Sequence, residues 1–186
     1  MMKTTQYAAE IVNELNRTIE LISEDEAEKL VDQILKSKKI LVAGAGRSGF
    51  MAKSFVMRMM HMGLDAFVVG ETVTPGLEKD DILIIASGSG ETKSLVSMAE
   101  KAKSLDASVA VVTISPDSTI GKISDLAIKI PAKPKAGADS DYKTIQPMGS
   151  LFEQSLLLFF DSVILRVMNK KELAGQKMYG RHANLE

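Results

Sequence analysis

Apolar runs recur along the middle of the chain and alternate with segments of helical periodicity. Five runs are almost wholly apolar instead of alternating with polar residues, and they lie at 40–43, 66–69, 82–86, 108–113 and 126–130. Strands covered on both faces have this composition, which is typical of a parallel sheet between helical layers. Helical patterns separate several of the runs, at about 48–62, 92–104 and 118–123. The pattern therefore predicts an α/β fold, a three-layer α-β-α sandwich around a doubly wound, five-stranded parallel sheet.

The two ends of the chain are predicted to be helical. A first amphipathic helix is indicated by apolar residues at helical spacing, Ile11, Leu15, Ile19 and Ile22. A second helix follows Ser23, a candidate N-cap with Glu26 at the capping-box position. After a long aperiodic loop at 131–146, Pro147 suits the first turn of a helix that runs to about residue 168. This last helix is apolar nearly all round, so we expect it to be buried within the fold or against another subunit.

Length and composition favour one ordinary globular domain. Its predicted parts are N-terminal helices at about 5–36, the sheet with its helices at about 39–130, the loop at 131–146, and a C-terminal helix and tail at 147–186. The 23 Lys and Arg residues balance 24 Asp and Glu residues, so no global field attracts nucleic acid or anionic lipid. The absence of cysteine excludes thiolate chemistry and disulfides, and the presence of only two histidines argues against a histidine-rich metal centre.

No apolar run is long enough to span a membrane, and the N-terminus lacks the apolar core of a secretory signal. We therefore expect a cytoplasmic protein without a metal, nucleic-acid or membrane partner.

The first predicted strand ends in a glycine-rich loop, GAGRSG at 44–49, where a helix begins. Glycines let the backbone approach a ligand, and the N–H groups at a helix start favour an anion. The spacing also matches the dinucleotide fingerprint G-x-G-x-x-G, with Glu71 near the position of a ribose-binding acid. A third interpretation is a turn that serves only close strand–helix packing. In this loop, Arg47 would contact a phosphate or sugar hydroxyls, or point into solvent.

The third predicted strand ends in a second loop of this kind, SGSGET at 87–92. Its three hydroxyls and its backbone amides make a neutral cradle for a phosphate monoester, and the dipole of the following helix adds a favourable field. Serine and threonine are also common helix caps. Capping needs one such residue, whereas this loop has three with two glycines, which favours phosphate binding. Both loops follow strands of a parallel sheet, so we expect them to meet at one edge.

The two loops resemble those of the sugar isomerase (SIS) domain family, which binds phosphosugars. Within that family the match is close to the 6-phospho-3-hexuloisomerases, and it is carried by GAGRSG at 44–49, VVGETVTP at 68–75, SGSGET at 87–92, QPMGSLFEQ at 146–154 and RHANLE at 181–186. The resemblance implies a SIS-like fold, a homotetramer built as a dimer of dimers, and no cofactor. It also implies interconversion of 3-hexulose 6-phosphate and fructose 6-phosphate in formaldehyde fixation by the ribulose monophosphate pathway, beside hexulose-phosphate synthase.

The loops and the resemblance together indicate the site residues. The predicted substrate-binding residues are Gly46, Arg47, Ser48, Ser87, Gly88, Ser89, Gly90, Glu91 and Thr92. The resemblance implies that Glu153 transfers a proton from C2 to C3 through a 2,3-enediol, one carboxylate serving as base and then as acid. On the residues alone, the alternative for an acidic side chain in so apolar a helix is a structural ion pair or a contact with solvent.

The two histidines have different expected roles. The resemblance implies that His182 completes the site, in its own or a neighbouring subunit; the alternative is a solvated residue of the polar tail. His61 lies about 20 Å along the same predicted helix from Ser48, so we expect it to pack at a subunit interface.

Two other functions stay open at this level. SIS domains also occur as non-catalytic sugar-phosphate sensors in regulators, with both loops intact. Glu153 and the lack of an attached DNA-binding segment favour the enzyme over the sensor. A dinucleotide-dependent oxidoreductase would need a second substrate-binding region, for which 186 residues hardly leave room.

Overall fold

All five predicted strands form, and they make one parallel sheet in the order β2-β1-β3-β4-β5. In this computed structural model, which describes residues 2–134 and 142–182, the strands are β1 (Ile40–Gly44), β2 (Ala66–Val68), β3 (Ile82–Ala86), β4 (Ser108–Thr113) and β5 (Leu126–Lys129). Each bound lies within one residue of its prediction. The strand order reverses between β1 and β3, which confirms the doubly wound fold and marks the edge where ligands bind in such sheets.

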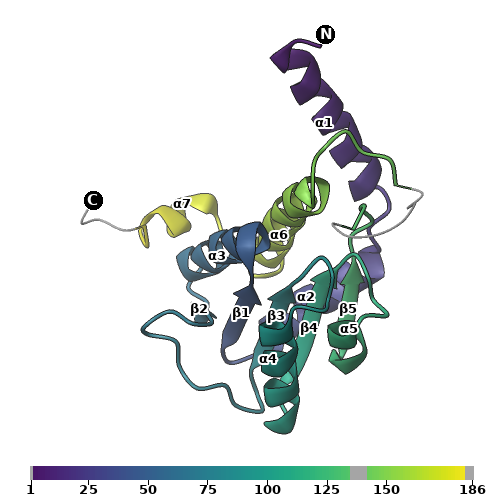
Figure 1. Cartoon of the computed structure of the whole chain (residues 1–186). Coiled ribbons are helices and arrows are strands. Elements are labelled where there is room, and N and C mark those ends of the chain that lie inside the picture. Colours follow the sequence, from purple (N-terminus) through teal and green to yellow (C-terminus); the bar gives the residue numbers. More distant parts are fainter. Residues whose placement is uncertain (1, 135–141, 183–186) are drawn as a thin grey trace.

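Helices cover both faces of the sheet (Figure 1). On one face lie α2 (Glu24–Lys36), α3 (Gly46–His61) and α6 (Ser150–Lys170); on the other lie α4 (Lys93–Ser104) and α5 (Thr119–Ile123). Alternate strand residues divide between the two layers. Val42 and Ile84 are buried with the first group of helices, whereas Leu41 and Ile85 are buried with the second. The continuous apolar runs are thus strands covered on both sides, as the sequence predicted.

The first helix leaves the body of the molecule. α1 (Thr4–Ile19) extends away from the sheet, and its C-terminal part packs on α6 (Figure 1). Tyr7 and Val12 on this helix are exposed. A short helix that the sequence did not predict, α7 (Gly175–Tyr179), follows α6. In the described ranges no helix has both the length and the apolar character needed to cross a bilayer.

The start of α6 differs from its prediction. Pro147 stands in a turn before the helix, Gly149 is the N-cap, and the helix begins at Ser150. Met148 adopts a left-handed conformation with φ of 58°, which interrupts helical geometry between Pro147 and Gly149. Part of the predicted loop at 131–146 lies outside the described residues. The predicted N-cap at Ser23 is confirmed, since its Oγ accepts from the N–H of Glu26 at 3.3 Å.

Candidate active site

The two glycine-rich loops meet at the edge of the sheet where the strand order reverses. Gly44 at the end of β1 pairs with Ala86 at the end of β3, so loops 44–49 and 87–92 emerge side by side. A cavity of about 400 Å³ lies between these loops and the start of α6. Six of the nine predicted binding residues line it: Gly46, Ser48, Ser87, Gly88, Ser89 and Thr92. The structure therefore brings the two predicted loops together around one cavity.

Two glycines of these loops are required by the backbone. A Cβ on Gly49 would lie 2.8 Å from the carbonyl oxygen of Gly44, so only glycine lets α3 start this close to β1. Gly90 has φ of +64°, and a Cβ there would lie 1.9 Å from the Oγ of Ser118. Gly90 does not line the cavity but allows its second loop to turn. The packing interpretation of the glycines is thus correct for Gly49 without excluding an anion at the helix start.

The serines of the second loop shape it and still offer hydrogen atoms to a ligand. Ser87 Oγ accepts from the N–H of Gly90 at 3.1 Å, and Ser89 Oγ accepts from the N–H of Glu91 at 3.2 Å. Because each hydroxyl accepts through its oxygen, its own hydrogen can be donated to a phosphate oxygen. The start of α4 lies at the same cavity, since its N-cap Thr92 and Leu95 in its first turn line it, and the first N–H groups of a helix have no partner within the helix. The loop therefore offers neutral donors and a helix dipole to an anion.

Glu91 has a structural contact on the far side of its loop. Its carboxylate accepts from the N–H of Thr119 at 2.7 Å and from the hydroxyl of Thr119 at 2.8 Å, at the start of α5. These hydrogen bonds lower the pKa of Glu91 and keep it charged. Its side chain is not among those that line the cavity. Its visible role is to tie the second loop to α5.

Arg47 links the first loop to α6. Its Nη1 donates to Ser150 Oγ at 2.9 Å and forms an ion pair with Glu153 Oε2 at 3.2 Å. The Glu153 side chain is 2% exposed and that of Arg47 is 55% exposed. Gly149 and Phe152, on either side of Ser150, line the cavity itself. Arg47 and Glu153 are not among the residues that line the cavity, so the buried carboxylate lies behind this wall with an arginine that compensates its charge.

His182 and His61 lie together, far from the loops. Their rings stack with centroids 5.3 Å apart, His61 being buried and His182 exposed. His61 ends α3 while Gly46 begins it, so the pair lies about 20 Å from the first loop of its own chain. Residues 183–186 of the predicted RHANLE segment lie outside the described residues. Within one chain the structure does not bring His182 to Glu153.

Glu71, the residue considered as a ligand for a dinucleotide ribose, is paired outside the cavity. Glu71 forms an ion pair with Lys53 of α3 at 2.5 Å, and both side chains are half-exposed. Glu71 does not line the cavity between the loops. Across residues 2–134 and 142–182, no three histidine, aspartate or glutamate side chains are grouped in a way that could hold a metal ion.

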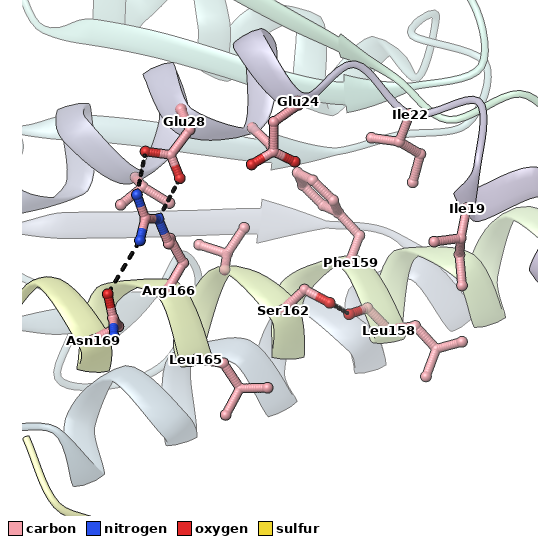
Figure 2. A pocket seen from close by; sticks show the side chains of 13 residues that line it. Ile19, Ile22, Glu24, Glu28, Leu158, Phe159, Ser162, Leu165, Arg166 and Asn169 are labelled. Carbon is pink, nitrogen blue, oxygen red and sulfur yellow. Dashed lines mark hydrogen bonds and ion pairs between the residues drawn. The ribbon is translucent and has the colours of Figure 1, made fainter.

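A second hollow, of about 470 Å³, has a different character. It lies between α2 and α6 and is lined largely by apolar side chains, among them Ile22, Phe159 and Leu165 (Figure 2). Arg166, the basic residue among its lining side chains, is already paired, since it donates to both oxygens of Glu28. The hollow offers no cradle for a phosphate, so the smaller cavity at the sheet edge is the candidate site.

Sequence reasoning missed several residues of that cavity. Four lining residues lie outside both glycine loops: Ile114, Pro134, Gly149 and Phe152. Gly149 and Phe152 fall in the QPMGSLFEQ segment, so that segment was the available signal. Ile114 directly follows β4, whose carboxyl end lies at the same edge of the sheet as those of β1 and β3.

Comparison with known proteins agrees with this architecture. The profile of the SIS domain family matches residues 33–158. The 3-hexulose-6-phosphate isomerase of Bacillus subtilis is 60% identical over 185 residues, covering 100% of both chains. The enzyme of that name from Methanocaldococcus jannaschii is 39% identical over 85% of this chain and 83% of its own. A solved Methanococcus jannaschii structure, for which the same function was inferred, is 34% identical, with a TM-score of 0.84 over 97% of this chain and 99% of that one. The chain belongs to the SIS domain family.

Proposed function

We propose that this protein is an isomerase that interconverts 3-hexulose 6-phosphate and fructose 6-phosphate. The observation that carries the proposal is the 60% identity, over the full length, to an enzyme of that name. The hydroxyl-lined cavity between the two loops supports a phosphate site, the buried carboxylate of Glu153 supports a proton carrier, and the names of the relatives support the identity of the sugar.

The phosphate binds in the second loop. Hydroxyls of Ser87, Ser89 and Thr92 donate to its oxygens, and the dipole of α4 favours its charge. Ser48 and the N–H groups at the start of α3 face the same cavity from the first loop. Holding the phosphate there orients the carbon chain of the sugar toward the start of α6, where Gly149 and Phe152 form the wall.

Glu153 moves the proton. In 3-hexulose 6-phosphate it removes the proton from C2, the C3 carbonyl becomes an enediol oxygen, and the carboxylic acid then returns a proton to C3 while C2 becomes the carbonyl. In total, one proton moves from C2 to C3 and a second proton moves from O2 to O3, so substrate and product have the same atoms. Arg47 forms an ion pair with Glu153, and in this proposal its positive charge also stabilises the charge that develops on the enediolate.

His182 belongs to a shared site in this proposal. It lies about 20 Å from its own first loop, so it can serve catalysis only if a neighbouring subunit brings it to another chain's cavity. A homotetramer, arranged as a dimer of dimers, would allow this contact. The exposed apolar residues Tyr7 and Val12 of α1 and Leu165 of α6 support such an assembly, because each would lose contact with water.

The substrate also indicates a metabolic neighbour. An enzyme that forms 3-hexulose 6-phosphate, hexulose-phosphate synthase, must supply it for formaldehyde fixation, and a consumer of fructose 6-phosphate must follow. Both compounds are phosphorylated sugars, which supports a cytoplasmic location.

The proposal is tested by supplying purified protein with 3-hexulose 6-phosphate and coupling its product to a readout for fructose 6-phosphate. We expect turnover without added metal or nucleotide. An inactive protein that is nevertheless stabilised against heat by fructose 6-phosphate would contradict the isomerase and identify a sugar-phosphate sensor instead.

A further inference from the structure

Glu14 is a buried charge on a helix that otherwise extends away from the body of the molecule (Figure 1). It is only 3% exposed, and the proposed mechanism does not use it. Its carboxylate receives three hydrogen bonds from the segment that precedes α6. They come from Thr144 Oγ1 at 2.6 Å, the N–H of Ile145 at 2.7 Å and Gln146 Nε2 at 2.9 Å.

These contacts require the charged form of Glu14. Burial alone would raise its pKa, but the hydrogen bonds from Thr144, Gln146 and Ile145, helped by the charge of Arg17, outweigh burial and lower it. At neutral pH the side chain is therefore a carboxylate that accepts charge-assisted hydrogen bonds, which are about twice as strong as neutral ones. Three donors converging on one buried carboxylate fix the segment 144–146 firmly on α1.

The contacts continue from this segment into α6. Gln146, itself buried, accepts from Gln154 Nε2 at 2.7 Å through its Oε1. Gln154 directly follows Glu153 on the helix. The path Glu14–Gln146–Gln154 thus joins α1 to the residue next to the proposed base.

A second path runs along the backbone. From Gln146 the chain passes through Pro147 and the left-handed Met148 to the N-cap Gly149, whose carbonyl accepts from the N–H of Glu153 at 3.0 Å. A non-glycine residue in the left-handed region persists only when its surroundings hold it there. The clamp on 144–146 holds one end of this turn, and α6 holds the other.

We propose that Glu14 is a positioning residue for the isomerase reaction, and this inference rests on the proposed function. By clamping residues 144–146 it fixes the turn that starts α6, and with it the direction of the Glu153 carboxylate. Arg47 also contacts Glu153, but its side chain is long and 55% exposed. A base must be placed to within a fraction of an ångström of its ideal position beside the carbon that loses the proton. A contact that fixes the start of α6 therefore affects kcat directly.

The chain offers a matched control at the C-terminal end of α6. Glu28 on α2 also ties an N-terminal helix to α6, through Arg166 (Figure 2) and through Lys170. Those partners lie beyond Glu153 by more than three helical turns, and none of them lines the candidate site. Loss of Glu28 should therefore lower stability without moving the base.

The test compares Glu14→Gln with Glu28→Gln, each assayed with 3-hexulose 6-phosphate well below its melting temperature. In Glu14→Gln we expect kcat to fall about tenfold or more while KM stays within about twofold, because the phosphate cradle is untouched. In Glu28→Gln we expect kcat close to that of the wild type. A double variant, Glu14→Gln with Gln146→Glu, exchanges donor and acceptor: the carboxylate at 146 can accept from both neighbouring amides, so kcat should recover.

Several results would overturn the inference. The first is that the wild type is active and Glu14→Gln has the same kcat. The second is that the double variant, Glu14→Gln with Gln146→Glu, recovers the melting temperature of the wild type but not its kcat. If Glu14→Gln does not fold, Gln154→Met, which cuts only the last link, decides the matter. A lower kcat at an unchanged melting temperature supports positioning, and an unchanged kcat rejects it. An inactive wild type would instead reject the proposed function, and this inference with it.

Discussion

Arg47 and Glu153 form the contact on which the proposed chemistry rests. A single guanidinium nitrogen reaches both Ser150 Oγ and Glu153 Oε2, so the first loop and the start of α6 are held by one side chain. The buried member of the pair is the carboxylate of Glu153, and the exposed member is the guanidinium of Arg47. Removal of Arg47 would leave a buried carboxylate without its cation, which is more costly than the loss of an ordinary surface pair.

Gly49 makes a prediction at the same scale. In Gly49→Ala the new methyl group would meet the carbonyl of Gly44 at 2.8 Å, so α3 must shift away from β1. We expect the free energy of unfolding to fall by about 1–3 kcal/mol, as for other overpacked sites. Urea unfolding measures this, with Gly76→Ala as the control, because nothing lies within 4 Å of a Cβ at Gly76. An equal effect of the two substitutions would contradict the packing argument.

Between elements, the pairing of α2 with α6 makes stability depend on pH. Hydrogen bonds from Arg166, and then from Lys170, lower the pKa of Glu28 to about 2, against an ordinary value of 4.5. On acidification the unfolded chain therefore takes up this proton first. The stabilisation is complete above about pH 4.5 and is lost as the pH falls toward 2.

Thermal melts of the wild type and Glu28→Gln test this dependence. The difference in melting temperature should be greatest near neutral pH, shrink between about pH 5 and pH 3, and also shrink with added salt because the groups are partly exposed. A difference that grows on acidification would mean that Glu28 does not pair in this way.

The sequence predicted the central elements well and their connections less well. Strands such as β3 were predicted to the residue because a strand buried on both faces leaves a continuous apolar run. The start of α6 was misplaced by three residues because the left-handed backbone at Met148 has no signature in a methionine. α7 is five residues long, too short for a periodic pattern.

The site shows the same division. Both glycine loops were predicted, because each can be identified from the residues that directly follow one strand. The Arg47–Glu153 pair and the Glu14 clamp join segments about a hundred or more residues apart, so no local pattern contains them. A signal for Glu14 did exist, because it lies on the same helical face as Ile11 and Thr18, where a charge is out of place without a buried partner.

For the whole molecule, the position of His182 leads to a prediction about shared sites. If a neighbouring subunit supplies this histidine, Glu153→Gln and His182→Ala are each inactive alone but form some complete sites when their chains are mixed. We expect co-expressed chains to recover about a quarter or less of wild-type activity, as random assortment at paired sites allows. Size-exclusion chromatography with light scattering should give a tetramer.

The matched control is a pair of variants that lie in the same cavity, Glu153→Gln with Ser87→Ala. Neither such chain can complete a site for the other if Glu153 and Ser87 come from one subunit, so their mixture should show no more activity than the two variants assayed separately. Recovery in both mixtures, or in neither, would contradict a site completed by His182.

The central claim is that Glu153 carries a proton between C2 and C3, and one measurement tests it most directly. Fructose 6-phosphate is incubated in D2O with wild type or with Glu153→Gln, and the position of deuterium is followed by NMR. The account predicts deuterium at C3 with the wild type and exchange slowed roughly a hundredfold or more in the variant, which still binds the sugar phosphate. Deuterium at C1, or exchange at the wild-type rate in Glu153→Gln, would contradict it.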